Sequence, residues 1–209
     1  KRPDLLSRCL DALTRQDYDP RCYEIIVCDD EPGAATAERV RQYQAAAWPQ
    51  IRYIPVTSTQ GPAAARNRGW RAARGAVIAF TDDDTIPARR WLREAEKVFT
   101  QTGAAAVMGR IVVPLSRMPS DYERDAAGLE RAEFATANCF YLKRVLEETG
   151  GFDERFGAAW REDADLFFTV LEHQGRAMTA SDAVVVHPVW PAGWGRSEER
   201  RVGKECRSW

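Results

Sequence analysis

The chain has few of the features that build zinc sites, membrane spans or secretion signals. Only 2 histidines occur among its 209 residues, and its 5 cysteines form neither a CxxC pair nor a spacing typical of zinc ligands. No apolar run approaches the roughly 18 residues of a membrane-spanning helix, and the N-terminus lacks the basic, apolar and small-residue regions of a signal peptide. We therefore expect a cytoplasmic protein whose thiols are reduced and mostly structural.

Excess charge is also lacking, since the formal net charge is -1 at pH 7. This balance gives no bulk electrostatic attraction to nucleic acid, so we expect no nucleic-acid partner. Hydrophobic residues make up 44% of the chain and charged residues 29%, as in an ordinary soluble globular protein. No repeat or low-complexity linker divides the chain, which favours a single domain.

Both ends of the chain are unusual. The sequence begins at Lys1 and runs directly into a helical pattern over residues 3–14, from which we expect a missing segment upstream. Residues 196–209 show no periodicity and resemble the translation of a common sequencing adapter. We expect this tail to be non-native, the alternative being a natural charged tail, and we assign the domain to residues 1–195.

Apolar runs typical of buried strands alternate with helical patterns through the first half of the chain. The expected strands cover residues 23–28, 51–56, 76–80 and 105–113, and the expected helices cover residues 3–15, 34–46, 62–73 and 88–101. Such alternation predicts an α/β fold in which helices flank a Rossmann-like, mostly parallel sheet. Beyond residue 116 the pattern becomes irregular, as in a substrate-binding portion, until a further helix over residues 162–173.

Two of the expected strands end in aspartates. Asp82, Asp83 and Asp84 follow the apolar run 76–80, and Asp29 and Asp30 follow the run 23–28. Adjacent carboxylates repel one another unless a cation or solvent intervenes, and Mg2+ and Mn2+ prefer carboxylate oxygen. The first group therefore predicts a metal site that can hold a diphosphate, the alternative being an acidic turn that caps a helix opening near Pro87. Because ligands bind beyond the carboxyl ends of strands in open α/β sheets, both groups should face one crevice.

Glu162 and Asp163 open the helix expected over residues 162–173. Unpaired backbone N–H groups and the helix dipole favour ionised carboxylates in a first turn, and a rigidly held carboxylate suits a general base. The alternative is routine helix capping.

His187 ends the apolar run 183–186 and is a candidate Mn2+ ligand, or else an ordinary loop histidine. His173 is expected to be a C-terminal cap.

A glycine-started helix follows the second expected strand, with the sequence GPAAARN over residues 61–67. The helix N-terminus at Gly61 can receive an anion, and Arg66 offers two parallel donors to a phosphate group. The alternative is an alanine-rich packing helix whose arginines are solvated.

Taken in order, five motifs resemble those of the family 2 glycosyltransferases with the GT-A fold. They are Asp29-Asp30, GPAAARN at 61–67, FTDDD at 80–84, GGFDE at 150–154 and EDADL at 162–166, and the resemblance spans residues 1–195. It implies inverting transfer of a sugar from a nucleotide-diphosphate donor to the hydroxyl of a saccharide or lipid-linked acceptor, with Mn2+ or Mg2+ as cofactor. It also implies a role in cell-surface polysaccharide or glycoconjugate synthesis, and peripheral association of the full-length parent with the inner face of the membrane.

The resemblance assigns roles to individual residues. Asp163 matches the catalytic base and Glu162 lies beside it, whereas Asp82, Asp84 and His187 match the metal site. The remaining donor-binding assignments are Asp30 at the donor base, Asp29, Gly61, Arg66 and Asn67 near the nucleotide, and Asp82 and Asp83 in the DxD motif.

Departures from the family pattern leave other functions open. The first strand of the family is absent before Lys1, and Glu31-Pro32-Gly33 replaces the usual Gly-Ser after the aspartate pair. A sugar-phosphate nucleotidyltransferase is the alternative enzyme, although no glycine- and lysine-rich phosphate loop is visible. A non-catalytic nucleotide-sugar-binding relative is the alternative from another class, and it would tolerate loss of Asp163.

Overall fold

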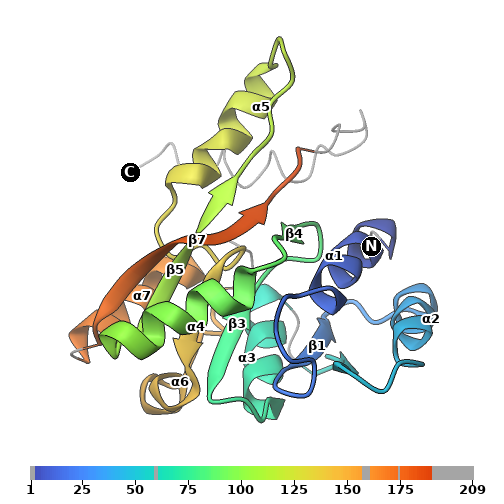
Figure 1. Cartoon of the computed structure of the whole chain (residues 1–209), viewed down its shortest axis with the longest axis horizontal. Coiled ribbons are helices and arrows are strands. Elements are labelled where there is room, and N and C mark those ends of the chain that lie inside the picture. Colours follow the sequence, from blue (N-terminus) through green and yellow to red (C-terminus); the bar gives the residue numbers. More distant parts are fainter. Residues whose placement is uncertain (1–2, 59–60, 157–160, 174, 190–209) are drawn as a thin grey trace.

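The computed structural model describes residues 3–58, 61–156, 161–173 and 175–189. Its helices are α1 (Pro3–Thr14), α2 (Ala34–Tyr43), α3 (Pro62–Ala72), α4 (Trp91–Thr102), α5 (Asp121–Ala126), the 3-10 helix η1 (Ala127–Arg131), α6 (Lys143–Thr149) and α7 (Glu162–Glu172). Its strands are β1 (Glu24–Asp29), β2 (Gln50–Pro55), β3 (Val77–Phe80), β4 (Ile86–Pro87), β5 (Ala106–Val112), β6 (Cys139–Leu142) and β7 (Ala177–Val186) (Figure 1). The expected tail over residues 196–209 lies outside the described residues.

The strands and helices expected in the first half of the chain are confirmed, with small differences at their ends. The largest difference at a helix start is at α4, which begins at Trp91 rather than at residue 88. Ile86 and Pro87 form the short strand β4 instead of opening the helix, because they pair with Val186 and Val185 of β7. The pairing of β4 with β7 therefore fixes the position of the chain just after the Asp82–Asp84 turn.

Strand directions differ from the mostly parallel sheet that we expected, although the α/β class is confirmed. β1 and β2 form a parallel pair, and a five-stranded sheet has the order β3-β6-β5-β7-β4. Within that sheet only β5 and β7 are parallel, whereas β3–β6, β5–β6 and β4–β7 are antiparallel. The reason is that β6, from the irregular second half, lies between β3 and β5 and runs against both. An apolar run shows that a strand is buried but not which way its neighbour runs.

Helices cover both faces of the five-stranded sheet. On one face, apolar residues of α1, α2 and α4 form a core cluster with Val107, Phe140 and Val185. On the other, residues of α3, α6 and α7 pack around Cys139 and Tyr141. Phe140 thus points to the first cluster and its two neighbours to the second, as the alternation of side chains along a strand requires. The sheet is therefore buried on both sides, and β3 ends between two helical layers.

A cavity of about 850 Å³ runs between β1 and β3. Among the described residues each of these strands pairs along one edge only, and apolar side chains of both, including Ile25 and Ile78, line the same space. Its acidic end is formed by residues at and just beyond the ends of the two strands, namely Asp29, Asp30, Asp82 and Asp83. The prediction that the two acidic groups face one crevice is confirmed for these four residues, whereas Asp84 is not among those that line the cavity.

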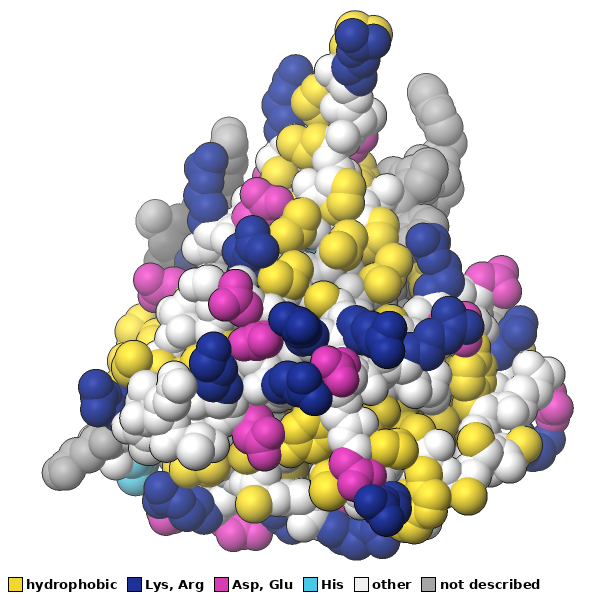
Figure 2. Space-filling view, in the orientation of Figure 1, with side chains coloured by type: hydrophobic (Ala, Val, Ile, Leu, Met, Phe, Trp, Pro, Cys, Tyr) yellow, Lys and Arg dark blue, Asp and Glu magenta, His cyan; other side chains and the backbone are white. Residues whose placement is uncertain are grey.

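The chain also presents an apolar surface on a projecting part that carries α5 (Figure 2). Leu115, Met118 and Tyr122 are exposed there, Met118 to 91%. Within the described residues, no helix combines the length and the apolar character needed to cross a bilayer.

Candidate functional site

The three aspartates lie in a turn that two threonines hold in place. Thr85 is fully buried, and its hydroxyl donates a hydrogen bond of 2.8 Å to the backbone carbonyl of Asp82. The hydroxyls of Thr81 and Thr85 lie 2.7 Å apart, and that of Thr81 donates to the carbonyl of Ala137 at 3.1 Å. These bonds satisfy polar groups inside the core and fix the backbone from which the Asp82 and Asp84 side chains project. Thr81 belongs to the FTDDD motif and Thr85 is in the sequence only a possible helix cap, so the sequence does not predict that their hydroxyls hold this turn.

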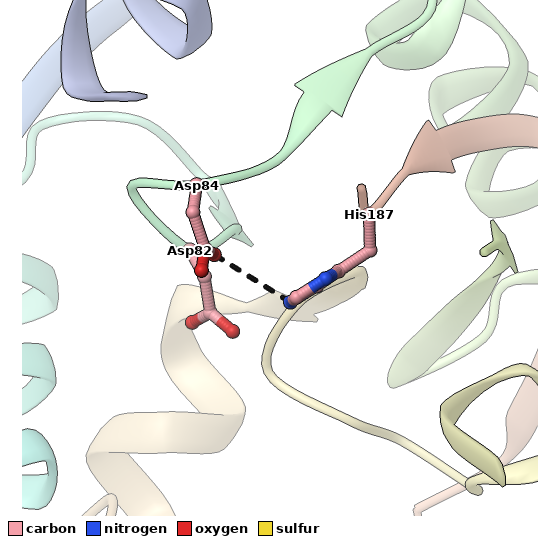
Figure 3. Close-up of side chains that lie close together, drawn as sticks. All are labelled: Asp82, Asp84 and His187. Carbon is pink, nitrogen blue, oxygen red and sulfur yellow. Dashed lines mark ion pairs between the residues drawn. The ribbon is translucent and has the colours of Figure 1, made fainter. Parts of the chain in front are cut away.

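Asp82, Asp84 and His187 form a candidate metal site (Figure 3). One ligand atom from each side chain lies within 4.8 Å of the others, and Nε2 of His187 is 3.5 Å from Oδ1 of Asp84. The pairing of β4 with β7 brings the two segments together, and the His187 N–H donates to the Val112 carbonyl at 2.8 Å. Two carboxylates and one imidazole are a donor set that suits Mn2+, whereas Mg2+ favours oxygen alone.

The aspartates after β1 have different surroundings. The carboxylate of Asp29 accepts hydrogen bonds from the Tyr53 hydroxyl at 2.8 Å and from the Glu31 backbone N–H at 3.2 Å. Burial and this carboxylate raise the pKa of Tyr53 to about 12, so the phenol remains a donor to Asp29. Asp29 is thus held by its own sheet, and Asp30 is the next residue along the wall of the cavity.

Arg66 connects the aspartate turn to the start of α7. Its guanidinium donates to Oε1 of Glu162 at 2.6 Å and to Oδ1 of Asp82 at 3.4 Å, and it lies 5.7 Å from the centre of the Phe152 ring. Gly61 begins the helix with a φ of 112°, a conformation that favours glycine, and its carbonyl accepts from the Ala65 N–H. The geometry therefore places Arg66 between two carboxylates.

The start of α7 carries the candidate base. The preceding residue, Arg161, has a left-handed φ of 70°, which turns the chain into the helix. Glu162 is buried, and Oδ1 of Asp163 accepts a hydrogen bond from the Ala164 N–H at 2.8 Å. The helix ends as expected with His173 as its C-cap residue.

The charges of Arg66, Asp163 and Asp82 all affect the buried thiol of Cys139. Cys139 is buried beneath the site, and its pKa is raised by burial, lowered by the charge of Arg66 and raised further by Asp163 and Asp82. The three charges all act on the same thiol. The hydrogen bonds agree, because Arg66 joins Asp82 of the candidate metal site to Glu162, the residue that precedes the candidate base.

Asn67 lies apart from this group, in a buried network under the 150–154 turn. Its amide donates to the Phe152 carbonyl and to Glu154, and its oxygen accepts from Trp70 Nε1 and the Phe152 N–H. Gly151, with a φ of 81°, makes the close approach possible, because a Cβ there would lie 2.6 Å from the Asn67 oxygen. The structure thus gives Asn67 a scaffolding position, and the place near the nucleotide that the resemblance implies for it stays a prediction.

Comparison of the sequence with known proteins gives one matching family model and several similar proteins. A family model described as "Glycosyl transferase family 2" matches residues 1–167. Glycosyltransferase AglE of Haloferax volcanii is 28% identical over 210 residues, which span 95% of this chain and 67% of AglE. The pre-mycofactocin glycosyltransferase of Mycobacterium tuberculosis is 30% identical over 144 residues, which span 62% of this chain and 30% of that protein.

Solved structures share the architecture. Mannosyltransferase PcManGT from Pyrobaculum calidifontis, in complex with GDP-Man and Mn2+, has a TM-score of 0.72 at 26% identity, over 92% of this chain and 55% of that one. S. aureus TarS in complex with UDP-GlcNAc has a TM-score of 0.69 at 17% identity, over 90% of this chain and 56% of that one. The chain therefore spans about half the length of these solved relatives. Because the family model covers most of the chain and the solved neighbours share its architecture, the chain belongs to glycosyl transferase family 2 and has the GT-A fold.

Proposed function

We propose that this chain is the donor-binding and catalytic domain of a metal-dependent inverting glycosyltransferase. The observation that carries the proposal is the gathering of Asp82, Asp84 and His187 within 4.8 Å, next to an arginine that contacts the start of α7. A cation site beside a helix that presents a carboxylate is what diphosphate departure and hydroxyl activation require together.

We assign donor binding to the acidic end of the cavity between β1 and β3. In this proposal Asp30 contacts the base of the nucleotide, with Asp29 held behind it by Tyr53. Asp82 and Asp83 face the ribose and diphosphate, and Asp82, Asp84 and His187 hold the cation. A bound Mn2+ or Mg2+ supplies positive charge that stabilises the leaving diphosphate.

Asp163 acts as the general base. Its carboxylate lies in the first turn of α7, where the backbone N–H groups are not used within the helix. Its carboxylate takes the proton of the acceptor hydroxyl, whose oxygen attacks the anomeric carbon from the face opposite to the leaving diphosphate, so the configuration inverts. Glu162, buried beside it, carries the contact to Arg66.

The substrate class follows from the relatives. PcManGT was solved with GDP-Man and TarS with UDP-GlcNAc, which supports a nucleotide-diphosphate sugar as donor here. For the whole protein we propose a saccharide or lipid-linked acceptor, a role in polysaccharide or glycoconjugate synthesis, and action in the cytoplasm at the inner face of the membrane.

A panel of nucleotide sugars tests this function. Each sugar is added to the protein with Mn2+, with Mg2+ or with EDTA, and thermal stabilisation and release of nucleoside diphosphate are measured. We expect one class of donor to stabilise the protein and to release nucleoside diphosphate only when a cation is present. A sugar-phosphate nucleotidyltransferase would instead consume a nucleoside triphosphate and a sugar phosphate and release pyrophosphate, and that result would overturn the proposal.

A further inference from the structure

We propose that Arg66 is a positioning residue that shares its charge between Asp82 and Glu162, rather than a ligand of the donor phosphates. The inference rests on the proposed function, because it gives Asp82 to the cation site and places Glu162 beside the base. It replaces the phosphate-binding role that the sequence of α3 predicts for this arginine.

The first support is the burial of the pair. The Glu162 side chain is 3% exposed and that of Arg66 is 16% exposed, and their closest nitrogen and oxygen are 2.6 Å apart. A carboxylate buried to this degree needs a cation beside it, since an unpaired charge in a protein interior is strongly unfavourable. Among the described residues, Oε1 of Glu162 accepts from Arg66 whereas Oε2 has no hydrogen-bond partner, so the hydrogen-bonded compensation of this charge comes from Arg66.

The second support is the backbone that Glu162 anchors. Arg161 is one of two non-glycine residues with positive φ among those described, and such a conformation persists only where its surroundings hold it. Glu162, the buried acid of this pair, directly follows Arg161 and directly precedes Asp163. The Arg66–Glu162 contact therefore fixes the point from which the candidate base projects.

The third support is the contact with Asp82. At 3.4 Å, the Arg66 guanidinium neutralises part of the charge that Asp82 would offer to a cation. Arg66 thus has two separate effects: its charge weakens cation binding, and its contact with Glu162 holds the start of α7 in place. An arginine that bound the donor phosphates would in addition lose donor affinity when it is replaced, which a positioning residue would not.

Mn2+ titration of the donor-free protein, followed by electron paramagnetic resonance, separates these roles. For Arg66→Gln we expect Mn2+ to bind about threefold more tightly or better, because a positive charge next to Asp82 is removed. Transfer by the same variant should fall about 10-fold or more in kcat while the donor KM changes less than about threefold, because the base is displaced. Arg66→Lys should retain part of the activity. Arg68→Gln, an exposed arginine on the same helix, is the matched control and should change neither quantity.

A second variant distinguishes the effect of the lost charge from a simple loss of folding. Arg66→Gln leaves the Glu162 charge buried without a partner, whereas the double change Arg66→Gln/Glu162→Gln leaves two neutral amides that can bond to each other. We expect the double variant to recover most of the lost melting temperature and to keep the tighter Mn2+ binding. Unchanged or weaker Mn2+ binding in both variants, or a raised donor KM with kcat intact, would overturn the inference. Absence of transfer by the wild-type protein with every donor counts against the proposed function instead, because the Mn2+ comparison needs no donor.

Discussion

His187 lies at the end of β7 with its Nε2 only 3.5 Å from Oδ1 of Asp84, which comes from the turn after β3. The contact depends on the two-residue strand β4, whose pairing with β7 aligns the two segments. A histidine far along the sequence thereby joins two aspartates, and this juxtaposition gives the candidate cation site its mixed nitrogen and oxygen character.

Replacing His187 should change which cation the protein prefers. In His187→Gln the imidazole nitrogen is exchanged for an amide, so we expect Mn2+ affinity to fall about 10-fold while Mg2+ affinity changes little. Calorimetric titration with each ion measures both affinities. Asp84→Asn should weaken both ions, whereas Asp121→Asn, an exposed aspartate on α5, is the matched control. Equal loss of both ions in His187→Gln would remove the histidine from the metal site.

Removing Asn67 should cost stability rather than donor affinity. Asn67→Ala leaves the Trp70 N–H, the Phe152 N–H and the Phe152 carbonyl without their buried partner. Each unsatisfied buried group costs about 1 kcal/mol or more, so we expect a loss of about 3 kcal/mol in the free energy of unfolding. Urea denaturation measures this loss, and donor-induced stabilisation of the surviving folded protein should be unchanged. Intact stability together with weakened donor binding would contradict this expectation and support the nucleotide contact that the resemblance implies.

Cys28 should make the protein less stable at high pH. Burial in the wall of the cavity raises the pKa of its thiol to about 11, against opposing effects of Arg52 and Arg68. The ordinary value is 9.0, so above pH 9 the unfolded chain loses this proton while the folded chain keeps it until about pH 11. The stabilisation is therefore complete below pH 9 and is lost between pH 9 and about 11.

The melting temperature, measured at intervals from pH 8 to 11, tests this effect. Cys28→Ala should lose less stability over that range than the wild-type protein, and Cys22→Ala, which removes an exposed thiol, should follow the wild-type curve. Identical curves for all three proteins would show that burial of Cys28 does not hold its proton.

Local sequence patterns predict much of the first half of the fold. The apolar runs that became β1, β2, β3 and β5 are long enough to be recognised, and the acidic residues after two of them indicate where the crevice opens. The residues of the candidate metal site were also predicted together, because each lies at the end of an apolar run. The direction of β6 was not predictable, since it depends on which neighbours the strand meets.

The partners of Arg66 and Asn67 show why the rest of the site could not be predicted. Arg66 contacts Glu162 across 96 positions, and Asn67 contacts Phe152 across 85. Both residues lie on one helix and look alike as candidate donor ligands in the sequence. Their separate positions arise from helical geometry, since successive residues point about 100° apart, so that Arg66 faces the site and Asn67 faces the core.

The most direct measurement compares Asp163→Asn with Asp165→Asn in cation-dependent transfer. Both carboxylates lie in the first turn of α7, but Asp165 is exposed and lies outside the proposed site. With Mn2+ and the donor identified by the panel, we expect Asp163→Asn to lower turnover about 100-fold or more while donor-induced thermal stabilisation is retained, and Asp165→Asn to keep wild-type turnover. Undiminished transfer by Asp163→Asn would contradict the account, because the hydroxyl of the acceptor would then lose its proton to another group.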